Sequence, residues 1–245
     1  MLTPLARAPI GLPLILRRVA SRDLAARVAR LGLFENSRLT RLNDTVAIGP
    51  AKVRGPRGDV TLGGWLAAKL VIHTDDDRRL PLLECAQGDS GHVEGITGQA
   101  MVEESLAALG LEENDRITFL RRLPPMLYTA TVDGRERVRL SEGLAAKILG
   151  DTQNGPAQFC AVGVGEPFTV RRILAGEHAG ETLRALGIRP GLPLALVNVA
   201  AGQVVGSTRK TPVACATHDG LRLYFQEKDA NLLLVEPETP EAGEG

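Results

Sequence analysis

The chain repeats part of its own sequence. Residues 29–70 align with residues 107–148 without a gap, and 16 of the 42 positions are identical. The identities cluster in a Leu-Gly-Leu segment and in a Leu-Ala-Ala-Lys segment, which begins at Leu66 in the first copy and at Leu144 in the second. Clustered identity without gaps exceeds what shared composition produces, so the sequence predicts a row of small, similar units.

A third copy follows the second, because the pattern that starts at Glu104 recurs at Glu181. Its closing segment starts at Ala230, which lies farther along the chain from its counterpart Ala145 than Glu181 lies from Glu104. We expect the additional residues in a loop within residues 202–219. The sequence thus divides into three expected units and a disordered acidic tail, at residues 1–79 (divergent), 80–154, 155–236 and 237–245.

Each copy carries the same order of local signals. In the second copy, residues 91–96 alternate polar and apolar side chains as a strand does, and residues 101–109 have helical spacing. Asp133-Gly134 predicts the tight turn of a hairpin. A glycine follows the helix in all three copies, as a left-handed helix cap requires, at Gly32, Gly110 and Gly187. The predicted fold is mainly β with short helices, each unit a small closed or nearly closed β-barrel, because closure removes exposed sheet edges.

Composition excludes several classes of function. The net charge is zero, with 29 basic and 29 acidic residues, and aromatic residues make up 3% of the chain, so nucleic-acid binding is not expected. The absence of 18 consecutive apolar residues argues against direct membrane insertion. Three widely spaced cysteines predict a reducing compartment, the cytoplasm. The sequence also lacks a phosphate-binding loop and a recognisable catalytic set, so we expect no enzyme activity and no catalytic residues.

The segment Leu-Gly-Ile-Arg-Pro-Gly-Leu-Pro-Leu, residues 186–194, resembles the core motif of the FeoA family (ferrous iron transport protein A) and of the SH3-like domain in iron-dependent repressors. Copies one and two have Asn36 and Asn114 where this motif has its second glycine, and asparagine is the residue that best imitates glycine at positive φ. The resemblance implies three tandem SH3-like barrels. It further implies a non-enzymatic accessory or regulatory protein of ferrous iron uptake, whose partner is a FeoB-type membrane GTPase transporter or another iron-related protein.

Two groups of residues are candidates for a site. Cys215 and His218 are spaced to share Fe(II) or another divalent transition metal, although a buried cysteine and an exposed loop histidine explain the same pattern. His92 and Glu94 point to one face of a predicted strand, and their spacing favours a surface pair over a ligand pair. The resemblance places partner contacts in its motif, and Trp65 is either a partner anchor or a core residue. The candidate partner-binding residues are Leu186, Gly187, Ile188, Pro190, Gly191 and Trp65.

Two other functions remain open alongside the accessory role. Kinship with repressor domains and the Cys215/His218 pair favour a regulator that binds Fe(II) or another transition metal. Tandem barrels with sheet edges favour a self-assembling scaffold, and hence a homo-oligomer.

Overall fold

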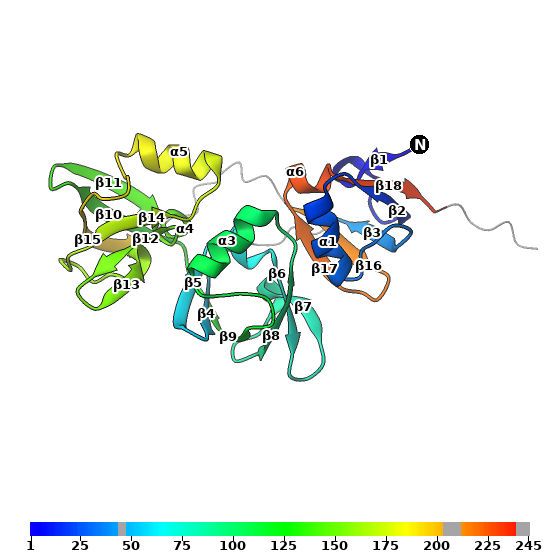
Figure 1. The fold of residues 1–245 in the computed structure, drawn as a ribbon, viewed down its shortest axis with the longest axis horizontal. Coiled ribbons are helices and arrows are strands. Elements are labelled where there is room, and N and C mark those ends of the chain that lie inside the picture. The colour runs from blue at the N-terminus through cyan, green and yellow to red at the C-terminus, as the bar shows by residue number, and fades with distance from the viewer. Residues whose placement is uncertain (44–47, 203–211, 239–245) are drawn as a thin grey trace, which may run out of the picture.

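A computed structural model describes residues 1–43, 48–202 and 212–238 of the chain. Its strands form three groups, which lie side by side in Figure 1. We call residues 51–122 the central unit and residues 126–201 the distal unit. The terminal unit combines residues 3–42 with residues 213–237.

The central unit contains one six-stranded antiparallel sheet in the order β5-β4-β9-β8-β6-β7. Its elements are β4 (Ala51–Gly55), β5 (Gly58–Leu62), α2 (Gly64–Ala67), β6 (Leu70–Thr74), β7 (Arg79–Pro81), the 3-10 helix η2 (Leu82–Glu84), β8 (Ser90–Ile96), α3 (Ala100–Ala108) and β9 (Arg116–Arg122).

The distal unit repeats this order in two three-stranded sheets, β11-β10-β15 and β13-β12-β14. An isolated bridge between Thr169 and Pro193 joins the two sheets. Its elements are β10 (Met126–Val132), β11 (Glu136–Ser141), α4 (Glu142–Ala145), β12 (Ile148–Thr152), β13 (Gly155–Gln158), the 3-10 helix η3 (Phe159–Ala161), β14 (Thr169–Ile173), α5 (Glu177–Ala185) and β15 (Leu194–Ala201).

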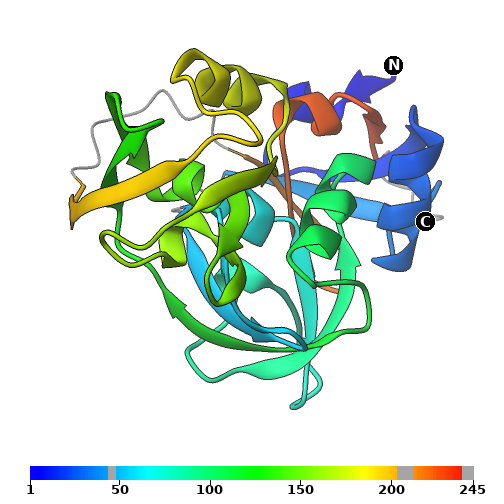
Figure 2. The same ribbon diagram turned by 60° about the vertical axis from the view of Figure 1, so that its left-hand side comes forward.

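The terminal unit is built from both ends of the chain. Its sheet has the order β17-β16-β3-β2-β18-β1, so one sheet contains strands from both the N-terminal and the C-terminal segments, and β18 lies between β2 and β1. Figure 2 shows the blue N-terminal strands beside the orange C-terminal ones. Its elements are β1 (Thr3–Pro4), the 3-10 helix η1 (Leu5–Arg7), β2 (Pro13–Val19), α1 (Arg22–Arg30), β3 (Arg38–Leu42), β16 (Val213–Thr217), β17 (Arg222–Phe225), α6 (Glu227–Ala230) and β18 (Leu233–Pro237).

The three units cross the divisions expected from the repeat. β9 pairs with β4 and β8 pairs with β6, so the central unit joins the second half of the first sequence copy to the first half of the second. The expected boundary between residues 79 and 80 therefore falls inside this unit. Only Leu123, Pro124 and Pro125 connect β9 to β10, and two consecutive prolines favour a stiff, extended connection. This connection carries β10 away into the next unit.

The sheets are not closed barrels, contrary to the expectation. The strands at one edge are short, since β1, β7 and β13 contain 2, 3 and 4 residues, and short edge strands limit unwanted pairing without closure. At the other edge of the central sheet, a side chain from the distal unit forms hydrogen bonds with the backbone of β5. The Thr61 N–H donates to Gln158 Oε1 at 2.9 Å, and Gln158 Nε2 donates to the Thr61 carbonyl at 2.7 Å.

The turn after the long helix is the same in all three units. In the terminal unit, Gly32 has φ 84° and donates to the Ala29 carbonyl at 3.0 Å, while Leu33 donates to the Val28 carbonyl at 2.9 Å. These two bonds define a Schellman cap. Equivalent pairs of bonds end α3 and α5, so the predicted glycine caps are confirmed. The residues with positive φ at these turns are Gly32, Asn36, Gly110, Asn114, Gly187 and Gly191.

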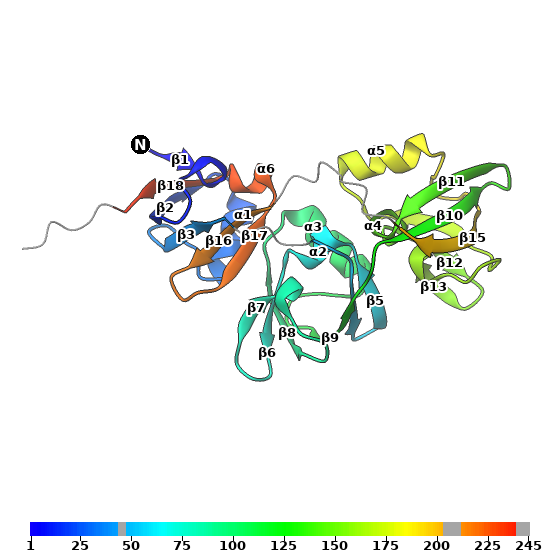
Figure 3. The same ribbon diagram turned by 180° about the vertical axis from the view of Figure 1, so that it is seen from behind.

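Each unit has its own buried cluster of apolar side chains, and polar contacts join the units. Lys69, two residues after α2, forms an ion pair of 2.8 Å with Asp229 of α6, and both side chains are buried. Tyr224 of β17 packs in the central cluster and donates its hydroxyl to Glu84 at 2.5 Å. Figure 3 shows β17 beside β7 from behind. The terminal and central units therefore share a packed interface.

Two remaining expectations concern regions that the structure describes only in part, and a third concerns membrane insertion. Residues 203–211 of the expected insertion lie outside the described residues, as do residues 239–245 of the expected tail. Pro237, the first residue of that tail, ends β18. Among the described helices, none has the length and apolar character that crossing a bilayer requires.

Candidate metal centre

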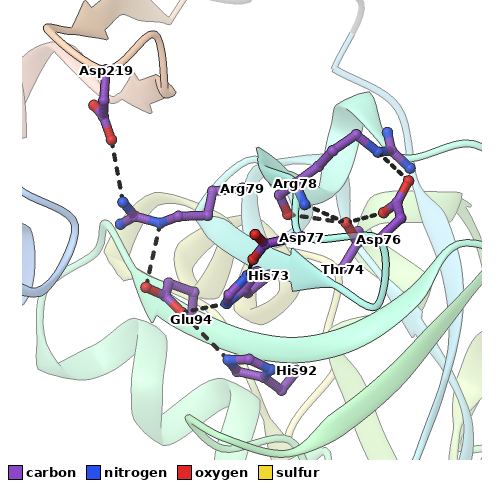
Figure 4. Close-up of polar contacts among 9 residues, drawn as sticks. All are labelled: His73, Thr74, Asp76, Asp77, Arg78, Arg79, His92, Glu94 and Asp219. Atoms are coloured by element: carbon purple, nitrogen blue, oxygen red, sulfur yellow. Dashed lines mark hydrogen bonds and ion pairs between the residues drawn. The ribbon is translucent and has the colours of Figure 1, made fainter.

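A row of polar side chains crosses three neighbouring strands of the central unit. His73 on β6 lies opposite Arg79 on β7 and opposite His92 on β8, and the two imidazole centroids are 5.0 Å apart (Figure 4). Gly91 permits this close approach of β8 to β6, because a Cβ at that position would lie 2.1 Å from the His73 carbonyl oxygen. The register of the sheet thus places both imidazoles on one face.

A β-bulge adds a carboxylate to the two histidines. Val71 pairs with Gly95 and Ile72 pairs with Val93, so Glu94 is the extra residue on β8. Its Oε2 atom lies 3.7 Å from His73 Nδ1 and 3.4 Å from His92 Nε2. Bulges commonly re-aim a side chain in this way. Two ring nitrogens and one carboxylate oxygen therefore converge.

The turn between β6 and β7 fixes the orientation of the His73 ring. Asp77 has φ 62° in this turn, and its Oδ1 lies 2.7 Å from His73 Nε2. Thr74 Oγ1 holds the turn by donating to Asp76 Oδ1 at 2.5 Å and accepting from the Arg78 N–H at 3.1 Å. Because Nε2 faces the Asp77 carboxylate, Nδ1 is the ring nitrogen on the side of Glu94.

An arginine lies within ion-pair distance of the other oxygen of the carboxylate. Arg79 Nε lies 3.4 Å from Glu94 Oε1, and its Nη1 donates to Asp219 Oδ2 at 3.2 Å. Asp219 belongs to the turn between β16 and β17, so the terminal unit takes part in this network (Figure 4). Engagement of Oε1 leaves Oε2 directed at the imidazoles.

The three converging groups have the chemistry of a transition-metal site. His73, His92 and Glu94 each offer one ligand atom, and these atoms all lie within 4.8 Å of one another. Imidazole nitrogens with a carboxylate oxygen suit divalent first-row ions, whereas Mg²⁺ and Ca²⁺ prefer oxygen ligands alone. The side chains are 30%, 44% and 23% exposed, so an ion reaches them from solvent without unfolding.

The candidate ligands Cys215 and His218 occupy different environments. Cys215 on β16 is fully buried in the core of the terminal unit, and burial raises the pKa of its thiol to about 12. A metal ligand must be the thiolate, which this environment disfavours. His218 is exposed in the following turn. Within the described parts of the chain, neither residue joins a group of three or more ligand side chains.

The candidate partner-binding residues also separate into two environments. Ile188 is fully buried in the distal core, and Leu186 and Gly187 are half-buried at the end of α5. Pro190 and Gly191 are exposed in the turn that follows. Trp65 of α2 is half-buried in a shallow pocket, together with Met101 and Leu174 among others. The motif therefore shapes the turn from inside and presents only its tip to solvent.

His73 is the residue of the metal cluster that the sequence did not connect with the others. It ends the first sequence copy, whereas His92 and Glu94 belong to the second. Division of the chain at residue 79 separates them, and only the pairing of β6 with β8 brings them together. A further strand, β7, and the 3-10 helix η2 lie between β6 and β8 in the chain, so no local sequence signal marks the two histidines as neighbours.

Comparison with known proteins gives one match. A sequence model of the FeoA domain matches residues 80–151. No curated protein and no solved structure shows significant similarity to the chain. The matched segment runs from β7 to β12, so it includes part of the central unit and part of the distal unit.

Proposed function

We propose that this chain is a non-enzymatic accessory protein of ferrous iron uptake that acts in the cytoplasm by contact with a partner protein. The FeoA match at residues 80–151 is the observation that carries the proposal. The three cysteines are free thiols, which agrees with a reducing compartment. The partner we propose is a FeoB-type membrane GTPase transporter.

We further propose that all three units are FeoA-like. The equal strand order of the three groups supports this view, as do the three equivalent helix caps. The residues with positive φ that follow the caps, Asn36, Asn114 and Gly191, each donate their N–H to the neighbouring strand, at 2.7, 2.9 and 2.7 Å. One local geometry is thus used three times.

The turn after the long helix is the surface that we propose for the partner. In the terminal unit it presents Phe34, which is 60% exposed. In the distal unit it presents Pro190. The central unit has Glu112 at the position of Phe34, so the apolar character of the turn differs among the units. An exposed aromatic side chain on a rigid turn is a typical interface anchor.

A binding assay with the full chain tests the proposal. Immobilised FeoB-type GTPase should retain the wild-type protein, and Phe34→Ala and Pro190→Asp should each reduce retention about tenfold, as loss of an anchor worth about 1.4 kcal/mol does. Glu112→Ala is the matched control and should leave retention unchanged. The accessory role is wrong if the wild-type chain is retained no better than on a resin without the GTPase.

A further inference from the structure

We propose that His73, His92 and Glu94 bind one divalent transition-metal ion. This site lies in the central unit, its residues differ from those proposed for partner contact, and it does not depend on the accessory role. Its ligands are the two imidazole nitrogens His73 Nδ1 and His92 Nε2 and the carboxylate oxygen Glu94 Oε2.

The other two units show what the same position looks like without a metal site. The β-bulge recurs there, and its extra residue is Arg17 in the terminal unit and Arg171 in the distal unit. Arg17 pairs with Glu236 at 2.7 Å, and Arg171 pairs with Asp151 at 3.8 Å. Each acid occupies the place that His73 holds in the central unit. An arginine and an acidic residue at these positions are therefore enough for the bulged sheet to form.

In the central unit, the two positions of this pair and a third position beside them all carry side chains that can bind a metal. Glutamate stands at the bulge in place of arginine, and His73 stands in place of the acid. His92 lies where the terminal and distal units have Ile15 and Thr169. At these three positions the central unit therefore has side chains that can each donate a lone pair to a metal. The stability of the sheet does not require them, because the other two units fold with an ion pair there.

The geometry fits a small ion. Ligand atoms held about 2.1 Å from a tetrahedral metal lie about 3.4 Å from one another. The two nitrogen–oxygen separations in the cluster are 3.4 and 3.7 Å. Two imidazoles and one carboxylate leave further coordination positions open to water, as in the facial sites of non-haem Fe(II) proteins. Small rotamer adjustments therefore complete the site.

The groups around the ligands favour a cation and fix the ligand atoms. Asp77 orients the His73 ring, and such a carboxylate–histidine contact is a typical outer-shell feature of metal sites. Arg79 orients Glu94 and is itself paired with Asp219. The three carboxylates and one guanidinium beside the imidazoles sum to two net negative charges, which complements a dication.

Anaerobic titration of the full chain with Co(II) tests the proposal, because Co(II) reports its ligands through visible absorption. We expect one equivalent to bind, and we expect His92→Ala and Glu94→Gln to weaken binding at least tenfold. Asp77→Asn should weaken it about 10- to 100-fold, the usual effect of losing an outer-shell carboxylate. His218→Ala is the matched control, since this histidine is exposed in a neighbouring turn, and it should bind as the wild type does.

A second readout separates ligand loss from damage to the fold. Paramagnetic Co(II) should broaden the imidazole NMR signals of His73 and His92 and spare that of His218, while the far-ultraviolet circular dichroism of the variants stays unchanged. The proposal is overturned by a wild-type protein that binds no Co(II), by His92→Ala or Glu94→Gln proteins that bind it equally well, or by loss of binding in His218→Ala.

Discussion

The buried ion pair between Lys69 and Asp229 should dominate the coupling of the terminal and central units. The two side chains are 3% and 1% exposed, their charged atoms are 2.8 Å apart, and Gln99 Nε2 donates to the second carboxylate oxygen at 2.9 Å. Burial lowers the pKa of Lys69 despite the neighbouring carboxylate. The ammonium group therefore relies on Asp229 to remain charged. Asp229→Ala removes this support and leaves a buried cation without a partner.

The size of the loss follows from the cost of an isolated buried charge. Breaking a buried pair by removing one partner typically costs about 3 to 5 kcal/mol. If Lys69 instead loses its proton at pH 7, the cost is about 4.6 kcal/mol from its ordinary pKa, at about 1.36 kcal/mol per unit. Both routes predict that Asp229→Ala lowers the free energy of unfolding by about 4 kcal/mol. The double change Lys69→Met with Asp229→Leu should recover most of that loss, because apolar replacements avoid the desolvation cost.

Urea unfolding followed by the fluorescence of Trp65 measures this effect. The tryptophan lines the same pocket as Lys69 and Asp229, and it is the only one in the chain. Asp75→Ala provides the control, because its pair with Arg116 is exposed and should contribute less than about 1 kcal/mol. A loss below about 1 kcal/mol in Asp229→Ala would refute the reasoning. So would a double variant as unstable as the single one.

Two further predictions concern backbone and thiol chemistry. Asn114 has φ 67°, so Asn114→Ala should lower the free energy of unfolding by about 1 to 2 kcal/mol in urea, while Asn114→Gly should leave it within about 0.5 kcal/mol. Equal effects of the two changes would contradict the assignment of strain. Burial raises the pKa of Cys215 to about 12, so the unfolded chain releases this thiol proton at lower pH than the folded one. Stability should therefore fall as pH rises from about 9 towards 12, and less steeply in Cys215→Ala; identical slopes would exclude a contribution from this thiol.

Local features of the fold could be predicted from the sequence because short-range chemistry decides them. The helix caps depend on single glycines such as Gly110, and the hairpin between β10 and β11 depends on Asp133 and Gly134, whose φ angles are 49° and 67°. These residues adopt left-handed backbone conformations at little cost, so their positions mark turns. The strand predicted at residues 91–96 is observed as β8, which spans Ser90–Ile96.

Each unit joins one half of a sequence copy to one half of another copy, and we call these halves half-units. Their pairing could not be predicted from the same signals. Every sequence copy offers a first half and a second half with similar apolar patterns, so a first half can pair with the second half of any copy. The length and stiffness of each connection constrain this pairing, and Pro124-Pro125 after β9 is one such connection. The metal cluster depends on this choice, because His73 and His92 come from different copies.

The pairing of N-terminal and C-terminal strands in the terminal unit has a direct consequence for the candidate metal centre. β16 and β18 of the C-terminal segment pair with β3 and β2 of the N-terminal one, and this pairing brings Asp219 to Arg79. Arg79 in turn forms an ion pair with Glu94. A segment cut to the limits of the FeoA match would retain His92 and Glu94, but it would lose His73, Asp77 and Arg79. The candidate ligands and their supporting groups therefore come together only when β6 pairs with β8 and the C-terminal strands pair with the N-terminal ones.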